Sequence, residues 1–161
     1  MPQIVEFPER PYLGIRKTIT MTTFGVVGDR IAGMIGWLAE RGVALTGAPF
    51  FRYDSIDMAA DRLVVQVGVP IGVPVEPDGD MFTDVLPAGR FVTTTHHGHP
   101  DQLPGVIDTM LKWAEAQGLE WDMTRKDGTE HWGCRLELYP TNPLDAPDPN
   151  DWDIDLQFRL A

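Results

Sequence analysis

Hydrophobic side chains recur along the chain at two spacings, one typical of helices and one typical of strands. Within residues 31–42 (IAGMIGWLAERG) and residues 106–118 (VIDTMLKWAEAQG), they recur three and four positions apart, as on one face of an α-helix. Each segment ends in a glycine, Gly42 or Gly118, at the position where a helix end favours a left-handed backbone. The pattern predicts two amphipathic helices of the same design.

The two predicted helices are also related in sequence. A shift of 76 residues superimposes four identical pairs, which are Ile31 with Ile107, Met34 with Met110, Trp37 with Trp113, and Gly42 with Gly118. Four identities in twelve positions exceed the roughly one expected from ordinary composition. We therefore interpret the chain as two copies of one structural unit.

Segments with the pattern of β-strands flank each helix in the same order. They are residues 12–20, 49–54 and 62–71 in the first half, and residues 89–97, 133–140 and 152–160 in the second. The segment 72–89 between the halves is rich in proline and glycine, which predict turns. The sequence therefore predicts one α+β domain over residues 1–161, in which strand-helix-strand-strand modules span about 10–72 and about 84–161.

Duplicated modules of this kind usually assemble about an approximate twofold axis, with each of the two main helices covering its own half of an antiparallel sheet. Ligand sites favour interfaces between structural units, so we expect a ligand groove between the halves. Tyr53 in the first half corresponds to Tyr139 in the second, and Phe51 corresponds to Glu137. The second half would thus place a carboxylate where the first half has a ring.

Glu137 is the candidate that decides the chemistry of this groove. Charged or aromatic residues alternate around it with apolar ones, so that the two sets lie on opposite faces of a strand. A buried carboxylate is costly unless its pKa rises or a cation pairs with it. The aromatic residues that could line the same groove are Tyr139, Phe51, Tyr53, Trp37, Trp113 and Trp132. Core packing is the alternative for Trp37 and Trp113, and a packed surface position is the alternative for Trp132.

Composition and charge narrow the class of partner. The 161 residues carry 24 acidic and 13 basic side chains, and the net charge of −11 opposes nucleic-acid binding, which depends on Lys and Arg. The negative electrostatic field of such a protein is better suited to a neutral or cationic small molecule. The single cysteine, Cys134, excludes an internal disulfide and fits a reducing compartment. Because the chain has no signal-peptide pattern and no apolar run long enough for a membrane helix, we expect a cytoplasmic protein without a membrane partner.

Two groups of residues resemble metal sites, but neither has a complete set of ligands. His96, His97 and His99 are close in sequence, yet no further zinc ligand is obvious nearby. The five aspartates between Asp145 and Asp155 lack the glycine and glutamate of a helix-loop-helix calcium site, and we interpret them as an exposed turn. We therefore expect no metal and no cofactor.

Short segments throughout the chain resemble the GyrI-like family, which includes the effector-binding domains of AraC-type regulators and of multidrug-responsive transcription activators. They are YLGIR at 12–16, WLAERG at 37–42, LPAGRFV at 86–92 followed by HHG at 96–98, ELYPTNP at 137–143 and DWDIDLQFRL at 151–160. In this family the glutamate of the Glu-x-Tyr segment typically lies at the base of an aromatic pocket for cationic, lipophilic ligands. The resemblance assigns that role to Glu137 and places Tyr139 beside it. Because no DNA-binding region accompanies these segments, we expect a stand-alone member.

The residues and the resemblance together favour one function and leave two alternatives. We expect a protein of broad specificity that sequesters or senses lipophilic, cationic small molecules. Some GyrI-like proteins resemble hydrolases of reactive electrophiles, in which Glu137 would be the general base and Tyr139 or Tyr53 would position or protonate the leaving group. The other alternative is an inhibitor that binds a protein such as a DNA topoisomerase, with the acidic surface imitating nucleic acid.

Overall fold

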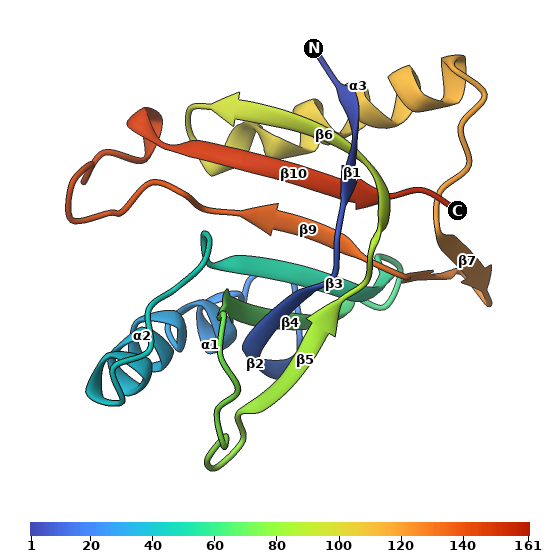
Figure 1. Cartoon of the computed structure of the whole chain (residues 1–161). Helices are drawn as coiled ribbons and strands as arrows, with labels where there is room; N and C mark the ends of the chain where they lie inside the picture. The colour runs from blue at the N-terminus through green and yellow to red at the C-terminus, as the bar shows by residue number, and fades with distance from the viewer.

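A computed structural model describes all 161 residues, and its ten strands form one antiparallel sheet. The strands are β1 (Gln3–Phe7), β2 (Arg10–Ile19), β3 (Phe50–Asp57), β4 (Arg62–Pro70), β5 (Phe82–Leu86), β6 (Gly89–His97), β7 (Met123–Lys126), β8 (Thr129–Trp132), β9 (Arg135–Leu138) and β10 (Asp153–Arg159). The sheet has the order β1-β6-β10-β9-β3-β4-β2-β5, and the β7–β8 hairpin extends it from β3. Figure 1 shows that this sheet curls into a half-barrel.

Two main helices pack on the sheet, one for each half. Helix α2 (Ile31–Glu40) lies against β4, helix α3 (Leu103–Ala116) lies against β6, and a short helix α1 (Gly25–Gly28) precedes α2 (Figure 1). As predicted, each main helix is followed by a glycine with a left-handed backbone, Gly42 at φ 69° and Gly118 at φ 71°. The predicted pair of helices is confirmed. No helix is long and apolar enough to cross a membrane.

The order of strands in the sheet is symmetric, so that each strand of one half has an equivalent at the same distance from the centre in the other half. Strands β6, β10 and β9 of the second half correspond to β2, β4 and β3 of the first, and β9 pairs with β3 at the centre. The edge strands are exchanged between the halves, because β1 precedes β2 but pairs with β6, and β5 precedes β6 but pairs with β2. This arrangement confirms the predicted α+β fold of two related halves about an approximate twofold axis.

The structure also contains strands that the sequence pattern did not predict, among them the N-terminal β1. Strand β5 lies inside segment 72–89, so the prediction of turns alone was wrong there. It is short and follows a run of glycines and prolines, and its backbone is satisfied by pairing with the distant β2. Strands β7 and β8 are joined by Asp127 (φ 54°) and Gly128 (φ 81°), which form a two-residue hairpin turn. An Asp-Gly pair is a strong signal for such a turn, so this hairpin could have been predicted.

The sheet buries side chains on both faces, and the face that carries the helices holds the larger core. Its members include Met34 and Leu38 from α2, Met110 and Ala114 from α3, and Leu156 and Phe158 from β10. The opposite face has a smaller core around Tyr12 and Phe50. Alternation along β9 places Leu136 and Leu138 in this smaller core and turns Glu137 toward the helices.

Candidate functional site

Glu137 lies on β9, at the centre of the sheet where the two halves meet. Its backbone pairs with Phe51 of β3 on one side and with Leu156 of β10 on the other. Because strands on both sides hold β9 in register, the direction of the Glu137 side chain is fixed. The residue is only 7% exposed. The structure therefore buries a carboxylate at the junction of the halves.

Aromatic side chains surround this carboxylate. The Tyr139 hydroxyl donates a hydrogen bond of 3.1 Å to Glu137 Oε2, and the Tyr139 ring stands edge-on to the Phe51 ring at a centroid distance of 5.5 Å. The Phe24 ring, from the turn before α1, lies 6.0 Å from Phe51 and 6.3 Å from Tyr53. We call these four residues (Phe24, Phe51, Tyr53 and Tyr139) the ring cluster. Only Tyr53 is buried and the other three are half-buried, so the cluster is open on one side.

Burial shifts the pKa of Glu137. Removal from water raises the pKa of Glu137 above its ordinary value, and this effect outweighs the opposing effects of two tyrosine hydroxyls and Arg135. Burial and the nearby carboxylate also raise the pKa values of Tyr53 and Tyr139, so both hydroxyls stay protonated and can donate. The groups around Glu137 offset only part of the cost of its burial, so a cation placed beside it would stabilise the ionised carboxylate.

A largely buried arginine shares the inner face of β9 with Glu137. The guanidinium of Arg135 lies over three rings, at centroid distances of 4.5 Å for Phe158, 5.0 Å for Trp132 and 5.5 Å for Tyr53. Its Nε has no hydrogen-bond partner, and its ion pair with Glu130 is long, at 3.9 Å. Sequence reasoning did not assign Arg135 a role, although the alternation that turns Glu137 inward applies equally two positions earlier.

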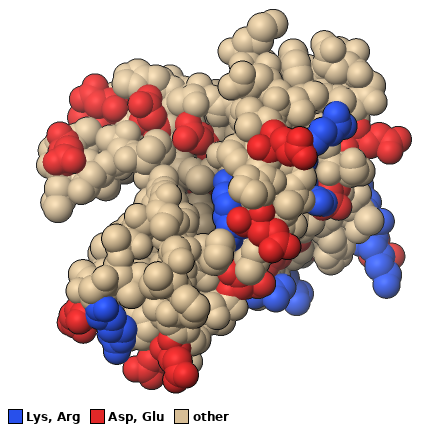
Figure 2. Space-filling view, in the orientation of Figure 1, with Lys and Arg blue, Asp and Glu red and all other residues tan.

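A deep hollow opens beside this part of the molecule. Figure 2 shows it between the lobe that contains the loop from β9 to β10 and the lobe that contains α2. The C-terminal end of β9 and the N-terminal end of β3, which pair at the junction of the halves, lie at the inner end of this hollow (Figures 1 and 2). Acidic side chains gather on the lobe that contains the β9–β10 loop. The hollow thus leads from an acidic surface to the junction of the halves.

Comparison with known proteins identifies the family. The family described as the GyrI-like small molecule binding domain matches residues 1–161. The chain belongs to the GyrI-like family. It is therefore a small-molecule-binding domain, as the resemblance of its short segments implied. No curated protein matches the chain.

Solved structures share the fold of this GyrI-like domain at low sequence identity. The EcmrR C-terminal domain is 18% identical with a TM-score of 0.74, over 100% of this chain and 97% of that one. In the EcmrR–DNA complex the identity is 18% and the TM-score is 0.76, over 99% of this chain, which spans only 57% of that one. SAV2435 bound to tetraphenylphosphonium is 10% identical with a TM-score of 0.57, over 100% of this chain and 94% of that one. A hydrolase from Listeria innocua is 13% identical with a TM-score of 0.64, over 99% and 91%.

Two of the predicted groove tryptophans lie on the helices of this GyrI-like domain. Trp37 on α2 and Trp113 on α3 are half-buried and pack against the helix-face core. The Arg41 guanidinium covers the Trp37 ring at 3.7 Å from its centroid. The ring contacts that connect the ring cluster do not extend to either tryptophan. Both positions fit the core-packing alternative.

Trp132 corrects the predicted arrangement of the groove. It was a candidate for lining the Glu137 groove, but it ends β8 and packs against Trp121 at a centroid distance of 5.9 Å. Its Nε1–H donates to Glu130 at 2.9 Å. Trp132 lines a separate cavity of about 430 Å³, which does not contain Glu137. A second cavity of about 410 Å³ on the opposite face of the sheet does not contain Glu137 either.

Two of the four histidines, His97 and His99, make local contacts with neighbouring residues. His97 Nδ1 lies 2.9 Å from Asp153 Oδ1 of the neighbouring strand, and His99 Nδ1 accepts the Asp101 amide at 3.0 Å at the start of a short 3-10 turn. No group of three His, Cys, Asp or Glu side chains is placed to hold a metal ion. Cys134 is fully buried, and burial raises the pKa of its thiol to about 11.

Proposed function

We propose that this protein binds lipophilic organic cations in the hollow between its halves, with Glu137 as the anionic group at the inner end. The observation that carries the proposal is the burial of the Glu137 carboxylate beside Tyr139 and Phe51. A carboxylate at the base and rings on the walls fit a ligand whose positive charge is enclosed by apolar surface.

The charge balance around Glu137 supports a cationic ligand. Burial raises the pKa of Glu137 by more than Arg135 lowers it, so Arg135 stabilises the ionised carboxylate only in part. A ligand cation within about 4–6 Å would favour the ionised form and recover part of the cost of burial. The acidic lobe beside the hollow and the net charge of −11 would attract cations from solution.

The similarity to SAV2435, solved with tetraphenylphosphonium, supports the same class of ligand. At 10% identity the similarity concerns the fold and not the individual side chains. The case for this chain therefore depends on Glu137 and the ring cluster.

The variant Glu137→Gln tests the proposal because it removes the charge and keeps the shape. Binding of tetraphenylphosphonium and of neutral triphenylphosphine oxide would be compared by titration calorimetry. We expect the affinity for the cation to fall by about tenfold to a hundredfold, since a buried charged contact is lost, and the affinity for the neutral compound to change by less than about twofold. Glu120→Gln, at an exposed position, is the control and should change neither affinity. Equal losses for both compounds would contradict the proposal.

Hydrolysis of reactive electrophiles is the second candidate function. The observation that favours it is the contact of 3.1 Å between the Tyr139 hydroxyl and Glu137, which places a proton donor beside a base. Glu137 would take a proton from an attacking water while Tyr139 or Tyr53 donates one to the leaving group. Styrene oxide incubated with the protein would then yield its diol, detected by chromatography, and Glu137→Gln would abolish the turnover. Binding of styrene oxide without product would count against this candidate.

A further inference from the structure

The cavity lined by Trp132 lies apart from the Glu137 hollow, between the C-terminal end of α3 and the β7–β8 hairpin. It has a volume of about 430 Å³, enough for a small aromatic molecule. The hairpin that forms one of its walls has no counterpart in the first half, where the chain runs from α2 to β3 without a strand pair. The cavity is therefore a feature of the second half alone and is not a product of the duplication.

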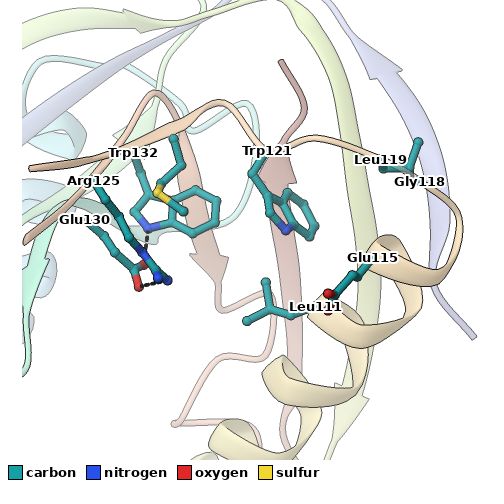
Figure 3. A pocket seen from close by; sticks show the side chains of 9 residues that line it. Leu111, Glu115, Gly118, Leu119, Trp121, Arg125, Glu130 and Trp132 are labelled. Atoms are coloured by element: carbon teal, nitrogen blue, oxygen red, sulfur yellow. Dashed lines mark hydrogen bonds and ion pairs between the residues drawn. The ribbon is translucent and has the colours of Figure 1, made fainter. Parts of the chain in front are cut away.

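Two indole rings form the apolar wall of this cavity. The ring centroids of Trp121 and Trp132 lie 5.9 Å apart, and the ring planes are inclined by 58°. The Phe158 ring packs against both, at centroid distances of 5.8 Å from Trp121 and 5.4 Å from Trp132. Figure 3 shows the two indoles facing Leu111 of α3 across the cavity. Trp121 is half-buried and Trp132 is only 7% exposed, so Trp121 supplies most of the ring surface that an aromatic ligand could contact. Because a third ring holds both indoles in place, that contact costs little side-chain entropy.

The charged groups of the cavity leave one carboxylate without a partner. Glu130 is already satisfied, because its Oε1 accepts the Trp132 indole N–H at 2.9 Å and its Oε2 accepts Arg125 at 3.0 Å. Glu115, one turn after Leu111 on α3, lines the cavity with an exposed side chain that has no hydrogen bond or ion pair. Figure 3 shows the Glu115 carboxylate turned toward the cavity. A ligand there would meet rings on one side and an unpaired negative charge on the other.

We propose that this cavity is a second small-molecule site, which binds a flat aromatic cation with its ring against Trp121 and Trp132 and its ammonium or amidinium group on Glu115. The site is distinct from the Glu137 hollow, because the Arg135 guanidinium lies between them, over the rings of both Trp132 and Tyr53. The proposal does not depend on the function proposed for Glu137.

The indole N–H signals in a proton–nitrogen correlation spectrum allow the site to be located. The protein has five tryptophans, and the variants Trp121→Phe and Trp132→Phe assign the two signals that matter. The probe is 2-naphthylmethylamine, a cation at neutral pH, and neutral 2-naphthylmethanol has the same ring and a similar size. We expect both compounds to shift the Trp121 and Trp132 signals saturably, with the amine binding about fivefold more tightly because its charge meets an exposed carboxylate.

Variants then separate this site from the hollow. Glu115→Gln should lower the affinity for the amine about fivefold and leave that for the alcohol unchanged. Glu120→Gln, an exposed glutamate nearby that does not line the cavity, is the matched control and should alter neither. In Glu137→Gln the shifts of the Trp121 signal should persist, whatever happens to binding in the hollow. The proposal is overturned if the Trp121 signal does not move at millimolar probe, if Glu115→Gln weakens both compounds equally, or if the shifts disappear in Glu137→Gln.

Discussion

The two halves of the domain place equivalent strands side by side and yet carry different chemistry. On β3 the first half presents Phe51, and directly opposite on β9 the second half presents Glu137. Two residues earlier the first half has Pro49 and the second has Arg135. Two residues later both halves have a tyrosine, Tyr53 in the first and Tyr139 in the second. Duplication thus provides a symmetric scaffold, and at these compared positions the only charged side chains, Arg135 and Glu137, belong to the second half.

The largest expected effect comes from making the first half like the second. Phe51→Glu would place a second carboxylate beside Glu137, and we expect a loss of about 3 kcal/mol in the free energy of unfolding at pH 7 from the uncompensated buried charge. Like charges and burial raise the pKa values of both carboxyl groups in the folded state above those of the unfolded chain. The folded state therefore holds more protons, so stability should recover as the pH falls through the raised values.

Urea unfolding at several pH values measures this effect. Phe51→Gln removes the ring without adding charge, and it should show a smaller loss that does not diminish in acid. If Phe51→Glu were as stable as Phe51→Gln at pH 7, the junction of the halves would be more hydrated than the burial of Glu137 indicates.

The next effect tests whether the halves are equal in packing. Met34 on α2 and Met110 on α3 are equivalent in the repeat and are 1% and 0% exposed. Truncation of either to alanine should cost about 2–3 kcal/mol in the free energy of unfolding, because each leaves a cavity in the same helix-face core. Chemical denaturation of the two variants gives the comparison directly. A cost below about 1 kcal/mol for only one of them would show that its helix is loosely packed.

The smallest effect concerns the ends of the two helices. Gly42 and Gly118 both have a left-handed backbone, at φ 69° and φ 71°, and an added Cβ would meet no atom within 4 Å at either position. Gly42→Ala and Gly118→Ala should therefore each cost about 1 kcal/mol of stability from backbone conformation alone. Thermal unfolding should show the same small decrease for both. A gain in stability at one site would mean that the backbone there adopts another conformation.

The periodic pattern and the internal repeat were sufficient to predict both main helices and the six strands of the two modules, with β3 and β9 as the strands that contribute to the junction. These features depend on local alternation, which is visible in the sequence. The same alternation predicted the direction of Glu137 relative to Leu136 and Leu138, which the structure has on opposite faces of β9. The role of Glu137 as a ligand-binding group stays a prediction.

Other features depend on contacts between distant segments and did not follow from local pattern. The exchange of β1 and β5 between the halves follows from pairing across the whole chain. Trp132 could not be placed without the β7–β8 hairpin, which turns it toward Trp121 and away from the ring cluster. The aromatic surroundings of Arg135 required Phe158 from the last strand, more than twenty residues away in sequence.

The affinity for tetraphenylphosphonium as a function of pH tests the central claim most directly, because this cation does not titrate. Glu137 must be ionised to attract it, and burial raises the pKa of Glu137, so the affinity should rise as the pH increases from about 4 to about 8. Calorimetry should also detect a proton released on binding at the acidic end of this range. In Glu137→Gln the affinity should be low and independent of pH. A wild-type affinity that does not change with pH, or that changes in the same way in the variant, would contradict the account.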